Sequence, residues 1–374
     1  MEHGKIWRHF DFMLLGGVAL LIIFGTAMIR STLLSSPDGG AYEMSRHLIF
    51  VLVGVPIVFI ISAIDYRLWG NLTGAIYATL IVLLLLVELL AETRFGAARW
   101  LSFGSFLFQP SELGKFLITL TLGHFVASRA EGLGKITMVI RSLVHVGVPM
   151  ALIFIEPDLS TSVIYAVIWF TLMWAAGLRW RHLALLAASA AAALPVGFLA
   201  VLNTPALNYQ ANRLIHFIIP DTSSVDYQDA AYNVNQALIS IGSGGWFGQG
   251  YGNGSQVQLR FLKVRHTDFI FSALSNEFGF LGAIVIIALI AFVVFRIFRA
   301  GSLARDLYGK LICYGVGMII LYQSFFNIGM NMNLLPVSGI PLPFVSYGGS
   351  ALWTFLFGIG LVQSVVLRHK AIEF

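Results

Sequence analysis

The chain has 374 residues, of which 58% are hydrophobic and only 11% are charged. Soluble domains carry about a quarter charged residues, so this composition excludes a water-soluble globular protein. The single cysteine, Cys313, excludes an intrachain disulfide scaffold and a cysteine-based zinc site. The formal net charge of +5 indicates basic residues gathered at one membrane surface rather than a nucleic-acid interface.

The apolar runs predict an all-α polytopic membrane protein, folded as a single integral membrane domain over residues 1–374. We expect ten transmembrane helices, with a long extracytoplasmic loop, about 203–267, between spans seven and eight. The predicted spans are 12–30, 46–64, 69–90, 111–128, 141–156, 160–177, 182–202, 268–295, 309–330 and 349–367.

Basic residues predict the orientation, because they gather on the cytoplasmic side of membrane proteins. An even number of spans puts both termini on one side, which we expect to be the cytoplasm. The basic residues assigned to that side are Lys5, Arg8, Arg67, Arg129, Lys135, Arg141, Arg179, Arg181, Arg296, Arg299, Arg305, Lys310, Arg368 and Lys370. The substantial segments 91–110, 203–267 and 331–348 then face outward, and we expect the chemistry there.

Asp268 lies where the long loop enters the eighth predicted span. One reading is an ordinary helix N-cap, made by Thr267 or Asp268, with the carboxylate at the positive end of the helix. The other is a general base at the mouth of a cavity. The neighbours Lys263, Arg265 and His266 favour the second reading, because they are donors able to hold an anionic group.

Three further acids lie in or beside predicted spans. Glu277 lies roughly 13 Å beyond Asp268 along a helix, a depth that favours a structural pair with another buried polar group over an interfacial reaction. Glu156 and Asp158 flank Pro157 in a tight turn. Two acids in such a turn suit a divalent cation, but a helix N-cap at Asp158 is the favoured reading.

The loop before the fourth predicted span carries Arg99 and Trp100. An interfacial Trp is more often a membrane anchor than a binding residue. The following run, FQPSELGK at 108–115, is typical of a helix start and places Lys115 one turn inside, with Glu112 before it. Lys115 either extends to the interface or binds a phosphate.

Two stretches rich in glycine or proline complete the outer segments. The glycines between 242 and 254 have no βαβ unit around them, so they are not a dinucleotide-binding fingerprint. A flexible hinge and a backbone cradle for a polar headgroup both stay open. Residues 331–350 combine three prolines with a Ser-Tyr-Gly-Gly turn. Non-helical backbone at the membrane edge should line a cavity or be buried in protein.

Four motifs lie between residues 99 and 351. They are Arg99-Trp100 with FQPSELGK at 108–115, PDLST at 157–161, GNGSQ with HTDFIF within 252–271, and LLPVSGIPLPFVSYGGSA at 334–351. On these motifs the chain resembles the SEDS family of bacterial cell-wall glycosyltransferases. The last motif and the short N-terminal segment look more like the elongation branch than the division branch, which is kept as an alternative. Glu156 departs from the pattern, since Gln or Lys more often precedes the Pro-Asp pair.

The resemblance implies a peptidoglycan glycosyltransferase that polymerises lipid II at the outer face of the bacterial cytoplasmic membrane during cell elongation. The C4 hydroxyl of one disaccharide-pentapeptide unit would be joined to the anomeric carbon of a growing glycan, with release of undecaprenyl pyrophosphate. It makes Asp268 the catalytic residue, and as a hypothesis this carboxylate takes the acceptor proton. The residues that it places near the cavity are Trp100, Glu112, Lys115, Asp158 and Ser350. The cations expected near the donor pyrophosphate are Arg99, Lys115, Lys263 and Arg265.

The expected partners are a class B penicillin-binding protein with transpeptidase activity, lipid II with nascent glycan, and membrane lipid, but no nucleic acid. No cofactor is fixed, and a divalent cation stays open. A lipid II flippase is the main competing class, but it should show an inverted repeat and polar groups along a path through the bilayer. A structural scaffold is the second, and it predicts that Asp268 can be replaced freely.

Overall fold

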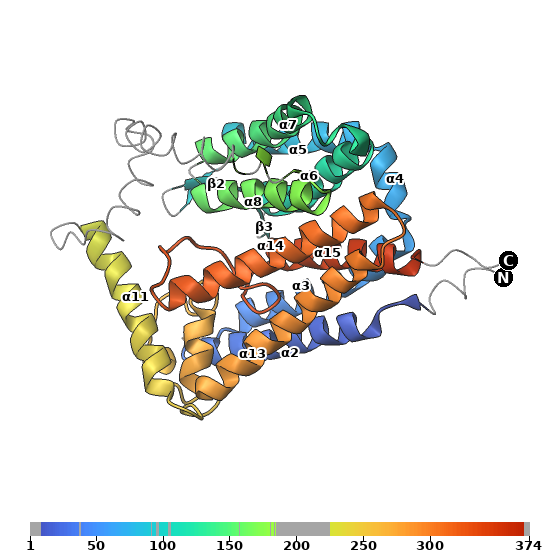
Figure 1. Cartoon of the computed structure of the whole chain (residues 1–374). Helices are drawn as coiled ribbons and strands as arrows, with labels where there is room; N and C mark the ends of the chain where they lie inside the picture. The colour runs from blue at the N-terminus through green and yellow to red at the C-terminus, as the bar shows by residue number, and fades with distance from the viewer. Residues whose placement is uncertain are drawn as a thin grey trace.

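The computed structural model describes residues 9–36, 39–90, 92–94, 97–103, 106–156, 158–179, 181–182, 184 and 225–369. Within these ranges the chain is a bundle of long helices with a small sheet (Figure 1). The helices are α2 (Phe12–Leu33), α3 (Ala41–Ala63), α4 (Tyr66–Asn71), α5 (Thr73–Leu90), α6 (Pro110–Ala127), α7 (Ile136–Ile155), α8 (Leu159–Ala175), α11 (Val225–Gly244), α12 (Ser255–Gln258), α13 (Ile270–Ser302), α14 (Leu307–Asn331) and α15 (Gly349–Leu367).

Seven helices in the described part of the chain are long and apolar enough to cross a membrane, namely α2, α3, α5, α7, α13, α14 and α15. Helix α8 is apolar but shorter. The predicted membrane class therefore holds, and each predicted span that the structure describes coincides with a helix. The seventh predicted span, 182–202, lies almost entirely outside the described residues, so the count of ten spans stays a prediction.

Helix α6, like α15, is buried along most of its length. It packs against α5, α8 and α14 and, with fewer contacts, α15. A helix enclosed by protein needs no apolar surface toward lipid. Glu112 and Lys115 therefore lie inside the bundle, buried among neighbouring helices.

Two elements depart from the expectation of irregular outer segments. Strands β1 (Glu92–Arg94), β2 (Ala97–Phe103) and β3 (Phe106–Phe108) form an antiparallel sheet in the order β1-β2-β3. Trp100 lies opposite Glu92 in this sheet. Helix α11 lies within the predicted loop 203–267, of which residues 203–224 are outside the described part.

Helix α13 is broken at Gly279, whose φ of 66° and ψ of −162° are not helical. The glycine-rich loop, residues 245–254 between α11 and α12, packs against this break. The amide of Phe280 donates to the carbonyl of Gly245 at 2.8 Å. A Cβ atom at Gly279 would lie 2.4 Å from the backbone nitrogen of Gly248. Glycine is therefore required at this close approach of two backbones.

The start of α2 and the end of α15 lie at the same end of the bundle (Figure 1). Gln363 joins them, because its Oε1 accepts from the amide of Asp11 at 3.0 Å and its Nε2 donates to the Asp11 carbonyl at 2.8 Å. Asp268 lies just before α13 begins, and Arg299 lies in the last turn of the same helix. The two residues therefore mark opposite ends of one long helix.

Candidate functional site

Asp268 is half-buried in the turn that precedes α13. The N-cap of α13 is Phe269, and it makes no side-chain capping hydrogen bond. The expectation that Thr267 or Asp268 provides the N-cap is therefore wrong, since the helix begins at Ile270. Thr267 instead donates from its hydroxyl to the carbonyl of Val264 at 3.3 Å.

Two asparagines of α14 fix the backbone of Asp268. The Nδ2 atoms of Asn327 and Asn331 each donate to the Asp268 carbonyl at 3.0 Å. Both side chains are fully buried, one helical turn apart. The Oδ1 atom of Asn331 also accepts from the amide of Ser272 at 3.1 Å and from its hydroxyl at 2.6 Å. The turn that carries the carboxylate is thus tied to α14 and to the first turn of α13.

The proline-rich loop, residues 332–348 between α14 and α15, lies along the turn that holds Asp268. Ser346 donates from Oγ to the carbonyl of Thr267 at 2.7 Å, and the Tyr347 amide donates to the carbonyl of His266 at 2.9 Å. A Cβ atom at Gly339 would lie 3.7 Å from the Oδ2 atom of Asp268. The HTDFIF motif and the proline-rich motif, far apart in sequence, therefore form one structural unit.

The neighbouring basic residues point toward different elements. Arg265 donates from Nε to the carbonyl of Thr32 at 2.9 Å and from a terminal nitrogen to the Ser35 hydroxyl at 3.1 Å. The Lys263 ammonium lies 5.2 Å from the centre of the Tyr232 ring. These contacts tie the loop to the end of α2 and to α11.

His266 packs edge-on against a tyrosine of the proline-rich loop. Its ring centre lies 5.6 Å from that of Tyr347. Burial lowers the pKa of His266, the charge of Arg265 lowers it further, and Glu43 opposes both. The ring is therefore neutral at pH 7, with two nitrogens that differ in hydrogen-bonding role.

A second polar cluster forms where the sheet meets α6 and α8. Asp158 caps α8, with Oδ1 accepting from the amide of Thr161 at 3.2 Å, as the favoured sequence reading predicts. The same oxygen lies 3.6 Å from a terminal nitrogen of Arg99, and Gln109 donates to Oδ2 at 3.2 Å. Asp158 therefore serves as a cap and as a partner of Arg99.

Glu112 and Lys115 extend this cluster into the bundle. Their carboxylate and ammonium groups lie 2.7 Å apart, and both side chains are buried. The Lys115 ammonium also lies 5.9 Å from the centre of the Phe355 ring on α15. Ser350 is buried in the first turn of that helix. The ring centres of Phe355 and of Phe344 in the proline-rich loop lie 5.5 Å apart. Helix α15 therefore contacts both the Lys115 ammonium and the loop beside Asp268.

Glu156 is buried in the turn before α8, and neither carboxylate oxygen has a hydrogen-bond partner among the described residues. Burial raises the pKa of Glu156 to about 8, and the charges of Asp158 and Glu88 raise it while Arg99 opposes them. The group is therefore mostly protonated at pH 7 and able to donate.

Two further observations bear on the sequence-based predictions. Glu277 is fully buried, and its Oε1 accepts from the hydroxyl of Ser31 at 2.5 Å, which agrees with the favoured structural reading. Within the described ranges, no group of three or more His, Cys, Asp or Glu side chains could hold a metal ion.

The predicted site residues thus fall into two groups. Arg99, Glu112, Lys115 and Asp158 gather around the starts of α6 and α8. The second group lies around Asp268, where Arg265 and Lys263 precede it in the chain and contact α2 and α11. Trp100 lies half-buried on β2.

Sequence reasoning missed Asn327 and Asn331. The signal was present, because two amides one turn apart are unusual in an apolar span and such groups hydrogen-bond across helices. It also missed Glu156 as a buried acid, and the hydroxyl of Tyr165, which is buried on α8 without a partner among the described residues. Nothing in the local sequence separates these groups from exposed ones.

The fold and these clusters define a polytopic membrane protein with charged and amide groups held inside its helical bundle. The family model for FTSW_RODA_SPOVE, described as a cell cycle protein, matches residues 9–371. The chain belongs to this family, as the SEDS motifs indicate.

Known proteins are similar over almost the full length. The peptidoglycan glycosyltransferase MrdB of Escherichia coli strain K12 is 32% identical over 365 residues, which cover 98% of this chain and 95% of MrdB. The crystal structure of the rod shape determining protein RodA of Thermus thermophilus shares 25% identity at a TM-score of 0.69, covering 96% of this chain and 97% of that one. A chain of a peptidoglycan synthase complex, solved to study the coordination of polymerization and crosslinking, superposes with a TM-score of 0.81 at 24% identity, covering 96% and 98%.

Proposed function

We propose that this chain polymerises lipid II into glycan strands during cell elongation, with Asp268 as the general base. It is a peptidoglycan glycosyltransferase, the activity that MrdB carries in its name at 32% identity over 98% of this chain. The match to RodA of Thermus thermophilus, a rod shape determining protein, supports the elongation role. The division-specific FtsW branch is the alternative within the same family.

The observation that carries the assignment of Asp268 is the fixed position of its backbone. Two buried amides, from Asn327 and Asn331, hold its carbonyl at 3.0 Å each, while the residue as a whole is half-buried. A catalytic base must be held within hydrogen-bond reach of the hydroxyl that it deprotonates.

The proposed reaction is a single displacement at the anomeric carbon of the donor. The acceptor C4 oxygen forms the new glycosidic bond, its proton passes to the carboxylate of Asp268, and the bond from the anomeric carbon to the pyrophosphate oxygen breaks. Undecaprenyl pyrophosphate leaves with the bonding electron pair, and Asp268 then releases its proton to water. Preorganised charge that meets the leaving pyrophosphate is commonly a large part of catalysis.

The substrate-binding roles are proposals for the two groups of the site. Arg99 and Lys115 are each paired with a carboxylate, at 3.6 Å and 2.7 Å. An incoming pyrophosphate would therefore have to replace or share these carboxylates. Trp100 and Ser350 are proposed to contact the sugar or lipid part of the substrates. Lys263 and Arg265 are proposed to attract the headgroup to the loop before Asp268.

The proposed setting is the bacterial inner membrane, with both termini in the cytoplasm and Asp268 facing outward. The joined ends of α2 and α15, opposite the turn that holds Asp268, support this orientation. A class B penicillin-binding protein is the proposed partner. Its support is the superposition with a chain from a complex that coordinates polymerization and crosslinking.

The test uses the purified full-length chain with lipid II in detergent micelles, where no membrane exists to be crossed. We expect glycan polymer from the unaltered chain, and a loss of about 100-fold or more with Asp268→Asn, the range typical of a removed general base. The control is Glu131→Gln, which removes an exposed carboxylate from the short 3₁₀ helix Ala130–Gly132. Near-normal turnover by Asp268→Asn would refute the base assignment. Absence of polymer from every form, together with lipid II transfer across vesicles, would favour a flippase.

A further inference from the structure

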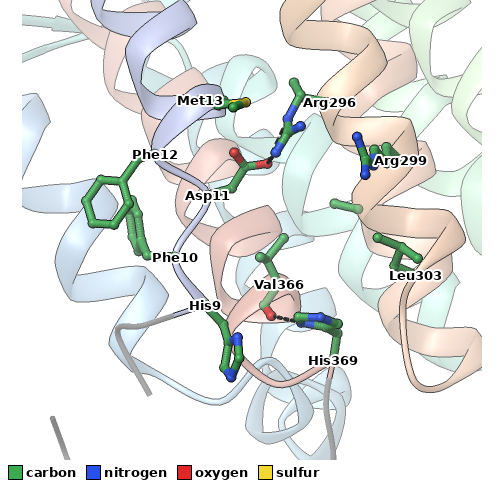
Figure 2. A pocket seen from close by; sticks show the side chains of 11 residues that line it. His9, Phe10, Asp11, Phe12, Met13, Arg296, Arg299, Leu303, Val366 and His369 are labelled. Carbon is green, nitrogen blue, oxygen red and sulfur yellow. Dashed lines mark hydrogen bonds and ion pairs between the residues drawn. The ribbon is translucent and has the colours of Figure 1, made fainter. Parts of the chain in front are cut away.

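A cavity of about 370 Å³ lies at the end of the bundle where α2 begins and where α13 and α15 end. The volume is within the range of small-ligand sites, about 300–1,000 Å³. Arg296 and Arg299 both project from α13, and His9 and His369 meet at the other end of the cavity (Figure 2). The proposed reaction does not use this cavity, because Asp268 lies beyond the opposite end of α13.

The charges of the cavity do not cancel. Asp11 is its only carboxylate among the described lining residues, and both of its oxygens are engaged. The Oδ1 atom accepts from the amide of Leu14 at 2.9 Å, and Oδ2 pairs with Arg296 at 2.7 Å. Arg299 has no hydrogen bond or ion pair from its side chain to any described residue, although it lines the same cavity. One guanidinium is therefore available to an anion.

The two histidines increase the polar character of the rim. Their ring centres lie 5.6 Å apart in an edge-to-face arrangement. The Nδ1 atom of His369 lies 2.5 Å from the carbonyl of Val366, so this nitrogen carries the hydrogen. The His369 Nε2 atom is then the acceptor in the neutral ring, and both nitrogens donate when the ring is protonated.

The rest of the rim is apolar and exposed. Phe12 is 67% exposed, Met13 is 64% exposed and Leu303 is 55% exposed, and all three line the cavity. Phe12 and Met13 open a helix that is apolar enough to span the membrane. These side chains therefore lie where the acyl chains of a lipid begin. A free anion would need the guanidinium but would gain nothing from this apolar edge.

We propose that this cavity binds the phosphate headgroup of an anionic phospholipid, with Arg299 as its main cation and Phe12, Met13 and Leu303 against the acyl chains. Basic pockets between transmembrane helices commonly hold anionic headgroups in this way. The bound lipid would join the start of α2 to the end of α13, next to the Asp11–Arg296 pair. The alternative is an ordinary basic residue at a helix end, attracted to the membrane surface without a specific lipid.

The chain supplies its own reporter for a binding test. Cys313 is the single cysteine of the chain and is fully buried, so a thiol-reactive dye reports thermal unfolding in detergent. A ligand that binds only the folded state raises the unfolding midpoint, and the rise grows as the ligand concentration exceeds its dissociation constant. We expect phosphatidylglycerol to raise the midpoint by several degrees more than phosphatidylcholine at equal concentration. This readout does not depend on polymerase activity, so its outcome is separate from that of the proposed function.

Arg299→Gln should lose at least half of the phosphatidylglycerol effect, and Arg299→Lys should retain more of it. The matched control is Arg305→Gln, which makes the same change of charge at an exposed position outside the cavity, three residues after the end of α13. Native mass spectrometry of the same variants counts bound lipid, should Arg299→Gln unfold early. A full response in Arg299→Gln, or equal losses in both Gln variants, would overturn the proposal. An equal rise with inorganic phosphate would also overturn it, in favour of a free-anion site.

Discussion

Asn331 holds the main-chain carbonyl of Asp268 at 3.0 Å while its own Oδ1 accepts two hydrogen bonds from Ser272. A single buried amide thus connects α14, the turn before α13 and the first turn of α13. The main-chain carbonyl of the proposed base is held by two amides of α14. The backbone is fixed by groups that do not touch the substrate in the proposed reaction.

Asn331→Ala should therefore lower kcat by about tenfold or more with little change in KM. The substitution leaves the Asp268 carbonyl with one donor and leaves Ser272 without its acceptor. Each buried polar group left without a partner costs about 1–3 kcal/mol. About 1.4 kcal/mol corresponds to a factor of ten in rate. The measurement is steady-state polymerisation of lipid II by the purified chain.

Two further variants distinguish positioning from general loss of stability. Ser272→Ala removes one hydroxyl that donates to Asn331 and should give a smaller loss of kcat. Asn71→Ala removes an exposed amide at the end of α4 and should change neither rate nor stability. A kcat for Asn331→Ala equal to that of the unaltered chain would contradict the positioning role.

The buried pair of Glu112 and Lys115 can be tested by combining substitutions. Lys115→Met leaves an unpaired carboxylate inside the bundle and should destabilise the chain by about 3–5 kcal/mol. Adding Glu112→Gln removes that charge and should restore most of the lost stability. Thermal unfolding of the single and double variants in detergent measures this coupling.

Activity of the double variant then decides what Lys115 does. If Lys115 binds the donor pyrophosphate, the double variant should stay inactive although its stability is restored. If the pair only stabilises the bundle, activity should return together with stability. Recovery of both would remove Lys115 from the proposed substrate-binding residues.

Glu156 predicts a specific dependence of stability on pH. Its pKa in the folded chain, about 8, is above its ordinary value of 4.5. As pH rises between these values, the unfolded chain loses the proton while the folded chain retains it, so the free energy of unfolding falls. The stabilising contribution is fully present below about 4.5 and is lost by about 8.

Glu156→Gln should abolish this decline, because the amide does not titrate. We therefore compare the thermal unfolding midpoints of the unaltered chain and of Glu156→Gln in one buffer series. The midpoint of the unaltered chain should fall relative to that of the variant from pH 5 to pH 8. Glu131→Gln, at an exposed site, should show no such difference. Parallel curves for the chain and for Glu156→Gln would show that Glu156 is ionised when folded.

Gly279→Ala should destabilise the contact between α13 and the glycine-rich loop. The new Cβ atom would meet the backbone nitrogen of Gly248 at 2.4 Å, at a positive φ of 66°. Strained backbone of this kind costs about 1–3 kcal/mol, and we expect a lower midpoint and faster proteolysis of the loop. Gly16→Ala is the control, because a Cβ atom there has nothing within 4 Å. Equal midpoints for both variants would contradict the close packing.

The sequence predicted the elements that depend on local pattern. The apolar runs located the long helices, and Pro110 with Ser111 marked the start of α6 because proline favours the first helical turn. The cap at Asp158 followed from residue type and position alone. The family motifs imply a catalytic role for Asp268, and this role stays a prediction.

What the sequence did not predict depends on contacts between distant segments. Arg265 reaches α2, far away in the chain, and Asn331 reaches the turn before α13. The N-cap of α13 falls at Phe269, after a turn in which the Asp268 carbonyl accepts from Asn327 and Asn331 of α14. The sheet and α11 were missed because their short or polar segments resemble loops in a membrane sequence.

The break at Gly279 divides α13 into two parts that have different surroundings. The part before the break is buried from Ile270 to Glu277, whereas Phe280, Leu281, Ile284 and Val285 beyond it are exposed. The longer part extends for about 35 Å, enough to cross the hydrocarbon core of a bilayer alone. A thicker or thinner bilayer would then change the tilt of the longer part. Because the carbonyls of Asn276 and Glu277 accept from the glycine-rich loop, the short part and the acid before it would keep their place as membrane thickness varies.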